Sequence, residues 1–489
     1  MPTLPPIDRV SVDDLMSLAT ERGSSPMQVG AVLFLDSRSG LDPEAALRVL
    51  ADRIRQVPRL RQRLVDVPRG CGRPAWVDDP AFDVSSRVCP APGGEAAVLD
   101  IAAGLLGTRL SRSRPLWVAV LVTGVGGGAP GAELAPGSLG SAGSPDSLGT
   151  FGARDAPVAS PDDRAALIIV FHHVLADGMG GLAVMASLVD RPAESLPRKR
   201  VNRRSGVPIT TIHPLSRKGS GGMPSVGALA RDAWAGRVRA VPHLPATLAR
   251  AVGGLLALRG SIGAPRLART SLNVPTGPRR RFVSIRLDLA EVLTAGHAHH
   301  ATVNDVVLTA IGGALHRLLD QRGERQETFV LSVPFSGRRQ AAAGELGNQS
   351  GVIPILVPGV GHPFTRLDAV ATATKTAKLA PAGASTALLG PFFRLLARLG
   401  LFQRFISRQR RIHTFVTNLR GPGEPLAIFG CPVTGLVPLT GPTGNVTVSF
   451  AVLSYAGGLE VTLAADPDTC PDLDALRALL EHEFAALLS

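Results

Sequence analysis

An uninterrupted apolar run covers Ala165 to Phe171 and ends directly at two adjacent histidines, His172 and His173. A short apolar run of this kind, bounded by a glycine-rich segment, is typical of a strand buried inside a sheet. Such a strand needs neighbouring strands and covering helices to keep its side chains from water. The run therefore predicts an α/β arrangement, and the glycines that follow at 178–181 predict a tight turn with an accessible backbone.

Other parts of the chain predict further strands and helices. Strands are expected at 30–35, 117–122 and 281–287, and helices at 289–298 and 303–319. A chain of 489 residues with 45% hydrophobic residues is longer than one hydrophobic core usually organises. We therefore expect an α/β (α+β) fold of two subdomains, at 1–190 and 275–489, joined by a basic and helical linker at 191–274.

Two stretches differ in composition from the rest of the chain. Residues 124–163 are rich in Gly, Ala, Pro and Ser without sustained periodicity, which indicates a flexible insertion between two strands. Five basic residues fall between Arg198 and Arg204, and Gly, Ser and Pro follow up to about Ser225, which is typical of a linker. Within the linker, a helical stretch is expected at about 244–258.

The charge balance and the cysteines limit the partners and the compartment. The chain has 52 Lys and Arg against 39 Asp and Glu, a net charge of +13 that favours anionic partners. Aromatic residues are only 4% and no zinc-finger spacing is present, so nucleic acid is not an expected partner. The cysteines predict neither a metal site nor a disulfide framework and fit a reducing cytoplasm; they are Cys71, Cys89, Cys431 and Cys470. Every apolar stretch is interrupted before it reaches membrane-spanning length, so membrane contact is expected to be peripheral.

The two adjacent histidines suit acyl transfer to a hydroxyl group. That reaction needs a base to take the hydroxyl proton as the oxygen attacks, and imidazole titrates near neutral pH. Because successive strand side chains point to opposite sides, one of the two faces a given cavity, and we favour His173. Asp177 is expected to hold the turn, or to orient an imidazole. The alternative is that both histidines only pack at a strand end.

The motif around the histidines belongs to a larger set. His172-His173-Val174-Leu175-Ala176-Asp177-Gly178 matches His-His-x-x-x-Asp-Gly in full. Further matches follow in order along most of the chain: Pro26-Met27-Gln28-Val29-Gly30, Pro115-Leu116-Trp117, Thr302-Val303-Asn304-Asp305-Val306, Val333-Pro334 with Gly347-Asn348, and Asn418 to Pro425. With this set the chain resembles the bacterial wax ester synthase/diacylglycerol acyltransferase family. The first motif alone also fits chloramphenicol acetyltransferase-like enzymes and peptide-synthetase condensation domains.

The resemblance implies a fold and a set of site residues. It implies two chloramphenicol acetyltransferase-like subdomains, each a mixed β-sheet flanked by helices, with a tunnel where they meet. It implies His173 as the general base. With it we expect His172 and Asp177 as further catalytic residues and Gly178 as a supporting residue. It also places Asn304 near the active site, although packing or helix capping is an equal explanation for that residue.

The sequence departs from the family pattern in three places. They are the long insertion at 124–163, Thr417-Asn418-Leu419-Arg420-Gly421-Pro422 in place of Ser-Asn-Val-Pro-Gly-Pro, and Met179-Gly180 after the Asp-Gly. These departures bear on the choice of acceptor rather than on the chemistry.

The motif chemistry and the resemblance together predict an O-acyltransferase that uses acyl-CoA as co-substrate and no bound cofactor. His173 would deprotonate a diacylglycerol or a long-chain alcohol, which attacks the thioester to give triacylglycerol or a wax ester. The expected location is the cytoplasm, with peripheral association with a membrane or lipid droplets. Two alternatives stay open: an acyltransferase or condensation enzyme that takes its acyl group from a carrier protein, and a lipid-associated binding protein without turnover.

Two further clusters have less specific explanations. Between Pro391 and Arg411, apolar residues and arginines recur at helical spacing on opposite sides. This pattern predicts either an interfacial helix on a lipid surface or an ordinary surface helix that faces its own core. His297, His299 and His300 lie between two predicted helices, where a solvated helix end explains them better than a metal site.

Overall fold

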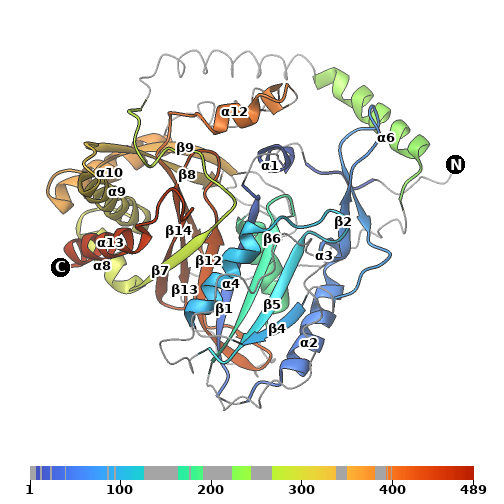
Figure 1. The fold of residues 1–489 in the computed structure, drawn as a ribbon, viewed down its shortest axis with the longest axis horizontal. Helices are drawn as coiled ribbons and strands as arrows, with labels where there is room; N and C mark the ends of the chain where they lie inside the picture. Colours follow the sequence, from blue (N-terminus) through green and yellow to red (C-terminus); the bar gives the residue numbers. More distant parts are fainter. Residues whose placement is uncertain are drawn as a thin grey trace, which may run out of the picture.

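A computed structural model of the chain contains two six-stranded sheets that lie side by side (Figure 1). It describes residues 7–11, 14–21, 25–38, 40–84, 88–92, 95–125, 164–175, 178–190, 223–243, 267–336, 350–379, 393, 395–397 and 399–489. Two sheets in one chain agree with the expectation of more than one hydrophobic core.

The first sheet has the strand order β11-β12-β1-β6-β5-β4. Its strands are β1 (Gln28–Asp36), β4 (Val88–Pro92), β5 (Trp117–Thr123), β6 (Arg164–His172), β11 (Ala427–Ile428) and β12 (Cys431–Thr440). β1 pairs antiparallel with β6 and β12, whereas β4 and β5 are parallel, so the sheet is mixed. β6 is buried along its whole length after Arg164, which confirms the strand predicted from the apolar run.

The second sheet has the order β7-β14-β13-β10-β8-β9. Its strands are β7 (Arg281–Asp288), β8 (Thr328–Ser336), β9 (Ser350–Pro358), β10 (Thr414–Arg420), β13 (Val448–Tyr455) and β14 (Gly458–Ala465). β10 runs parallel to β8 and β13, and the remaining pairs are antiparallel. The α/β class with a mixed sheet in each half is therefore confirmed. A small sheet joins β2 (Gln62–Val65) and β3 (Ala75–Asp78).

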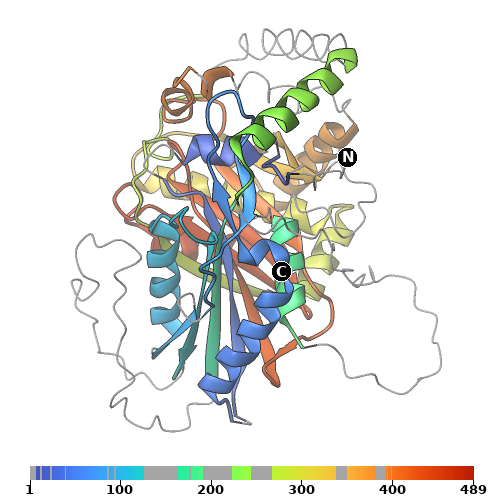
Figure 2. The ribbon, with the colours of Figure 1, turned by 90° about the vertical axis from the view of Figure 1, so that its right-hand side faces the viewer.

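Helices cover the faces of both sheets (Figures 1 and 2). They include α1 (Asp14–Thr20), α2 (Pro43–Gln56), α3 (Pro58–Arg61), α4 (Glu95–Gly107), α5 (Gly178–Leu188), α6 (Val226–Ala240), α8 (Leu289–Ala298), α9 (Val303–Gln321), α10 (Pro363–Leu379), α12 (Phe402–Ile406) and α13 (Leu473–Leu488). Ile54 of α2 and Val184 of α5 belong to the core on one face of the first sheet, and Ala102 of α4 to that on the other. α8, α9, α10 and α13 lie against the second sheet. Among the helices described, none is both long and apolar enough to cross a bilayer.

The two halves of the chain are interlocked. β11 and β12 come late in the sequence but belong to the first sheet, where β12 pairs with β1 over Val29–Leu35. Leu453 and Tyr455 of β13 also belong to the core that Ile54 and Val184 form on one face of the first sheet. The sequence did not predict this return, because an apolar pattern shows that a strand is buried but not which sheet it joins. The subdomain boundaries at 190 and 275 stay predictions.

One helix in the linker was missed. α6 lies within the stretch from 191 to 274, and its N-cap is Ser225, whose hydroxyl accepts a hydrogen bond from the Ala228 N–H at 3.3 Å. Its few large apolar residues are scattered among Ala, Gly and Arg and do not form the dense apolar face that indicates a core-facing helix in sequence. The basic cluster at 198–204 and the helix expected at 244–258 lie outside the described residues.

The prediction of a continuous amphipathic helix between Pro391 and Arg411 was wrong. Gly400 has a φ of 70°, a left-handed conformation that ends a helix, and α12 begins only at Phe402. Phe402 is buried, whereas Leu395 and Leu399 are 53% and 61% exposed. The segment therefore turns one apolar side chain to its own core and others to solvent.

The expected insertion connects two paired strands. β5 and β6 are antiparallel neighbours, and the Val125 N–H donates to the Arg164 carbonyl oxygen at 3.0 Å just beyond the pairing. Residues 126–163 themselves lie outside the described part of the chain. The two ends of the insertion are thus already held together without it.

We expect that replacing residues 126–163 with a short glycine-rich turn leaves folding and catalysis intact. The strand ends stay in register through their own hydrogen bonds, and short turns suit antiparallel neighbours. Melting temperature and specific activity, measured side by side with the full chain, provide the test. A large drop in either would show that the insertion contributes packed surface or part of a substrate passage.

Candidate active site

The backbone of the two histidines is held by strands on both sides. The His172 N–H donates to the Leu116 carbonyl at 2.9 Å, and the His173 N–H donates to the Met27 carbonyl at 2.8 Å. The Leu175 N–H then donates to the His172 carbonyl at 2.8 Å, which starts the turn after β6. The motif residues at 26–28 and 115–117 therefore lie beside the histidines and fix where the strand ends.

The imidazole of His172 is locked inside the protein. The side chain is 1% exposed, and its Nδ1 accepts a hydrogen bond from the Val174 N–H at 2.9 Å. Nδ1 must therefore be unprotonated, so the ring carries its proton on Nε2. Nε2 lies 3.2 Å from Oε1 of Glu21, an ion-pair distance at an angle that falls short of a good hydrogen bond. Both ring nitrogens thus face protein groups.

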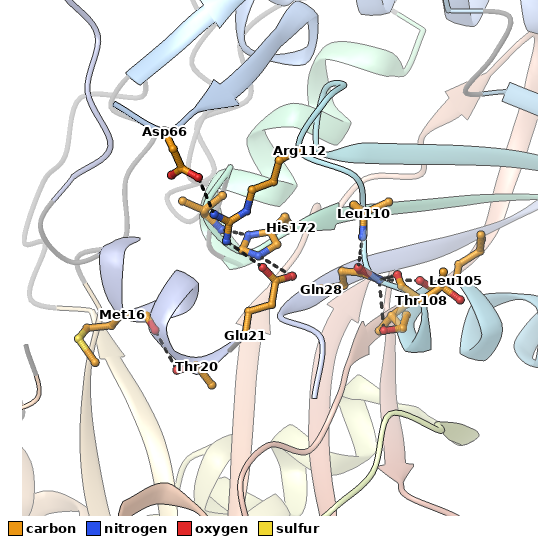
Figure 3. A network of polar contacts seen from close by, with 12 residues as sticks. Met16, Thr20, Glu21, Gln28, Asp66, Leu105, Thr108, Leu110, Arg112 and His172 are labelled. Atoms are coloured by element: carbon orange, nitrogen blue, oxygen red, sulfur yellow. Dashed lines mark hydrogen bonds and ion pairs between the residues drawn. The ribbon is translucent and has the colours of Figure 1, made fainter. Parts of the chain in front are cut away.

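Glu21 belongs to a small charged network that the sequence did not reveal (Figure 3). Arg112 lies 3.3 Å from Oε2 of Glu21 and 3.7 Å from a carboxylate oxygen of Asp66. Burial raises the pKa of Glu21, but its contacts with His172 and Arg112 outweigh burial and leave the pKa below its usual value. Glu21 is therefore an ionised carboxylate next to the first histidine of the motif.

Gln28 supports the same region from the other side (Figure 3). Its amide nitrogen donates to the carbonyls of Leu105 and Thr108 at 2.6 and 2.7 Å, and its amide oxygen accepts from the Leu110 N–H at 3.1 Å. The side chain is 3% exposed, so it satisfies the end of α4 without water. This motif residue thus has a structural role that stabilises the loop carrying Arg112.

The aromatic residue of a second motif also has a structural place. Trp117 is 2% exposed, and its indole N–H donates to the Leu60 carbonyl at 2.6 Å. Trp117 therefore has a structural role at the start of β5.

The glycine-rich end of the motif allows α5 to pack closely on β6. A Cβ added at Gly181 would lie 2.4 Å from the ring of Phe171, so a larger residue there would displace one element. α5 begins at Gly178, directly after Asp177, which lies outside the described residues. The proposed role of Asp177 in holding the turn therefore stays a prediction.

Three motifs from the second half of the chain converge on one pocket. Asn304 at the start of α9, Asn418 of β10 and the Val333-Pro334 pair of β8 line a cavity of about 220 Å³. Asn418 Nδ2 donates to Asn304 Oδ1 at 3.3 Å. The rest of the wall combines Ile353 and Ile355 with the side chains of Thr374, Ala377 and Lys378. Residues far apart in sequence thus form a largely apolar cavity with two carboxamides and an ammonium group in its wall.

The N-terminus of α9 is capped by other residues than Asn304. Thr302 and Asp305 form a capping box, in which the Thr302 hydroxyl and N–H both donate to Asp305 Oδ2 at 2.7 and 2.8 Å. The other carboxylate oxygen of Asp305 accepts from Thr374 at 2.7 Å. Helix capping therefore does not explain Asn304.

The second histidine cluster has the structural explanation expected for it. His299 is the C-cap of α8, and its ring stacks on Phe364 with 4.4 Å between centroids. His297 and His300 are exposed. Within the described part of the chain, no three His, Cys, Asp or Glu side chains are grouped to hold a metal ion.

Comparison with known families covers most of the chain. A model described as the wax ester synthase/diacylglycerol acyltransferase catalytic domain matches residues 10–130 and 160–307. A model of the WS/DGAT C-terminal domain matches residues 346–488. Residues 131–159, inside the expected insertion, lie outside the match.

Relatives and solved structures agree with these matches. The chain is 29% identical over 474 residues to a probable diacylglycerol O-acyltransferase of Mycobacterium tuberculosis, covering 95% of this chain and 91% of that protein. It is 26% identical over 503 residues to a putative diacylglycerol O-acyltransferase of the same species, with 97% and 90% covered. The structure of a wax ester synthase/diacylglycerol acyltransferase from Marinobacter aquaeolei VT8 superimposes with a TM-score of 0.64 at 18% identity, covering 98% of both chains. The first condensation domain of the CDA synthetase has the same fold, with a TM-score of 0.57 at 16% identity and 100% and 97% covered.

Proposed function

The chain belongs to the wax ester synthase/diacylglycerol acyltransferase family, and from this premise we propose that it transfers a fatty acyl group from acyl-CoA to the hydroxyl of a diacylglycerol. Long-chain alcohols are the second class of acceptor. The observation that carries the proposal is the arrangement of the motif histidines inside the matched catalytic domain. His172 is buried with both ring nitrogens facing protein groups, which supports the assignment of His173 as the base.

The proposed reaction needs one base and no covalent enzyme intermediate. His173 takes the proton of the acceptor hydroxyl while the oxygen attacks the thioester carbonyl. The carbon–sulfur bond of the tetrahedral intermediate then breaks, the new ester is released, and the CoA thiolate takes the proton back from the imidazolium. N–H donors near the carbonyl stabilise the oxyanion. His173 suits this role because it is only partly buried and its backbone is fixed by Met27.

We assign the Asn304 pocket to substrate binding. Its apolar wall suits a portion of an acyl chain, and the carboxamides of Asn304 and Asn418 offer donors to a carbonyl group. Since Thr302 and Asp305 already cap the helix, the position of Asn304 at the pocket wall is explained better by a ligand than by helix stability.

We expect Asn304→Ala to lower kcat/KM by about tenfold or more, because a carboxamide that binds substrate is lost. Its melting temperature should stay close to wild type. Steady-state kinetics and thermal unfolding measure the two effects. Thr302→Ala is the matched control: loss of the N-cap should lower the free energy of unfolding by about 1 kcal/mol with a smaller effect on kcat/KM. If Asn304→Ala loses stability instead of catalysis, the pocket assignment is wrong.

The proposed substrates are tested by offering several acceptors to one donor. Purified protein is incubated with radiolabelled palmitoyl-CoA and diacylglycerol, hexadecanol or no acceptor, and the products are separated by thin-layer chromatography. Labelled triacylglycerol is the expected main product. Transfer only from an acylated carrier protein would favour the condensation-type alternative, and binding of lipid without any product would favour the non-catalytic one.

We also propose that the enzyme meets its acceptor at a membrane or lipid-droplet surface. Diacylglycerol is nearly insoluble in water, so the protein must collect it from a lipid phase. The net charge of +13 suits contact with anionic lipids.

A further inference from the structure

The first part of α6 is fastened to the N-terminal half of the molecule. Leu229 is fully buried, and Asp232 forms an ion pair with Arg9 at 2.7 Å. Arg9 also donates to the Leu229 carbonyl at 3.1 Å. These contacts fix which side of the helix faces the protein.

The opposite side of α6 exposes large apolar side chains. Trp234 and Val238 are 66% and 47% exposed, and Val241, the C-cap residue of α6, is 57% exposed. A spacing of four residues places Trp234 and Val238 on one stripe, and Trp234 lies about 140° around the helix from Leu229. A surface helix normally turns its apolar stripe to its own core. Here the wider apolar stripe points away from the protein, so it needs a separate explanation.

Arginines lie next to this stripe. Arg231 and Arg239 are exposed on the same helix, and Arg237 donates to the Gly70 carbonyl at 2.7 Å. The outer surface of α6 therefore combines an aromatic ring and aliphatic side chains with fixed positive charge.

A second exposed apolar group lies at the same end of the molecule. Leu395, Leu399 and Leu401 are exposed in the segment that leads into α12, and Arg404 of α12 and Arg408 after it are also exposed. Figures 1 and 2 both show α12 and α6 at the upper end of the fold. Two exposed apolar groups with nearby arginines thus lie at the same end of the molecule.

We propose that α6 and the described residues 395–397 and 399–408 form a docking face for a lipid surface that carries anionic headgroups. Trp234, Val238 and the exposed leucines enter the boundary between headgroups and acyl chains, where tryptophan is favoured. The arginines contact the lipid phosphates. Charge complementarity selects this occupant, because an apolar stripe flanked by arginines matches a layer with apolar chains beneath negative headgroups.

The docking face is connected to the candidate active site. Gln403 of α12 donates to the carbonyls of Ala19 and Thr20, at 2.7 and 2.6 Å, in the last turn of α1. Glu21, the partner of His172, is the next residue. The face therefore lies against the end of α1, one residue from the carboxylate that contacts the first motif histidine. This inference uses the proposed function only to explain why a lipid surface is visited.

Tryptophan fluorescence tests the docking face without any need for turnover. The chain has three tryptophans, and Trp76 and Trp117 are 6% and 2% exposed, so Trp234 should dominate any change on binding. We expect vesicles of phosphatidylcholine with one quarter phosphatidylglycerol to shift the emission to the blue and to protect it from acrylamide. Vesicles of phosphatidylcholine alone should cause only a small blue shift and little protection from acrylamide. Trp234→Phe should remove the signal while vesicle binding persists.

Variants that remove charge and variants that remove apolar surface then separate the electrostatic and apolar contributions to vesicle binding. Arg231→Gln with Arg239→Gln should weaken vesicle binding by roughly 30-fold, since each arginine near an anionic surface contributes about a factor of five. Arg279→Gln with Arg281→Gln makes the same change in net charge away from the face and should have little effect. Val238→Gln should weaken binding more than Val360→Gln, whose side chain is similarly exposed, at 50% against 47%, but outside the face.

Two results would overturn the inference. The first is equal vesicle binding by the face variants and their controls. The second is sedimentation of the protein as a dimer that Val238→Gln dissociates, because the stripe would then be covered by a second copy. Activity on detergent-solubilised diacylglycerol distinguishes a failure of the docking face from a failure of the proposed function. The face variants should keep this activity. If wild type lacked this activity, the proposed function would be contradicted and the docking face would not.

Discussion

We expect His173→Ala to make ester about 10²- to 10⁴-fold more slowly than wild type, because loss of a positioned general base typically costs that much. The fold should survive, since the backbone of residue 173 is held by Met27 whatever the side chain. His172→Ala should act differently. It removes a buried ring from Val174 and Glu21, so it should lower the melting temperature and should also lower the rate, by a smaller factor than His173→Ala. Initial rates and thermal unfolding of the two variants distinguish these outcomes.

The exposed His297 provides the matched control for His173. His297→Ala removes an imidazole from the surface of α8 and should change neither rate nor stability. Near-wild-type turnover by His173→Ala with an unchanged melting temperature would show that this histidine is not the base.

We expect Glu21→Ala to lower the free energy of unfolding by about 2 kcal/mol, because it removes the buried carboxylate that faces Nε2 of His172 and pairs with Arg112. Activity should fall as well, since Glu21 is a positioning residue that acts through His172. Glu21→Gln keeps an acceptor oxygen and should recover most of both losses. A purely structural role would not predict that Glu21→Ala lowers kcat more than it changes KM and that Glu21→Gln restores kcat.

The pH dependence gives a second measurement on the same residue. The folded-state pKa of Glu21 lies below its usual value, so the stability due to its ionised form is present above that usual value. It is lost as the pH falls through the lower folded-state pKa. Wild type should therefore lose its advantage over Glu21→Gln in acid. Glu44→Ala, which removes an exposed carboxylate from α2, should change stability by less than about 0.5 kcal/mol at any pH. A constant difference between wild type and Glu21→Gln would contradict an ionised Glu21.

The sequence predicted the parts of the fold that depend on local pattern. β1, β5, β6 and β7 follow apolar runs, and α9 follows an apolar period that starts at the Thr302 cap. The return of β12 to the first sheet was not predictable, because pairing between distant strands leaves no local signal. The break at Gly400 was missed because apolar spacing continues across it, although a glycine at that point is a known stop signal.

In the candidate site, too, residues in local motifs were predictable from the sequence, whereas contacts between distant residues were not. The histidines, Asn304 and Asn418 were found as motifs, and the structure adds that the two asparagines share one pocket. Glu21 had no signal in the sequence, since a lone carboxylate in a short polar segment resembles any surface residue. Its role depends on long-range packing, which brings it against His172.

Release of CoA tests the central claim most directly. Free thiol and triacylglycerol are measured together for purified wild type and His173→Ala, with palmitoyl-CoA as donor and with or without diacylglycerol. The proposed mechanism predicts that wild type releases CoA only with the acceptor, mole for mole with triacylglycerol, and that the variant does so at least about 10²-fold more slowly. Equal release by both proteins, or release that does not depend on diacylglycerol, would contradict acyl transfer by His173.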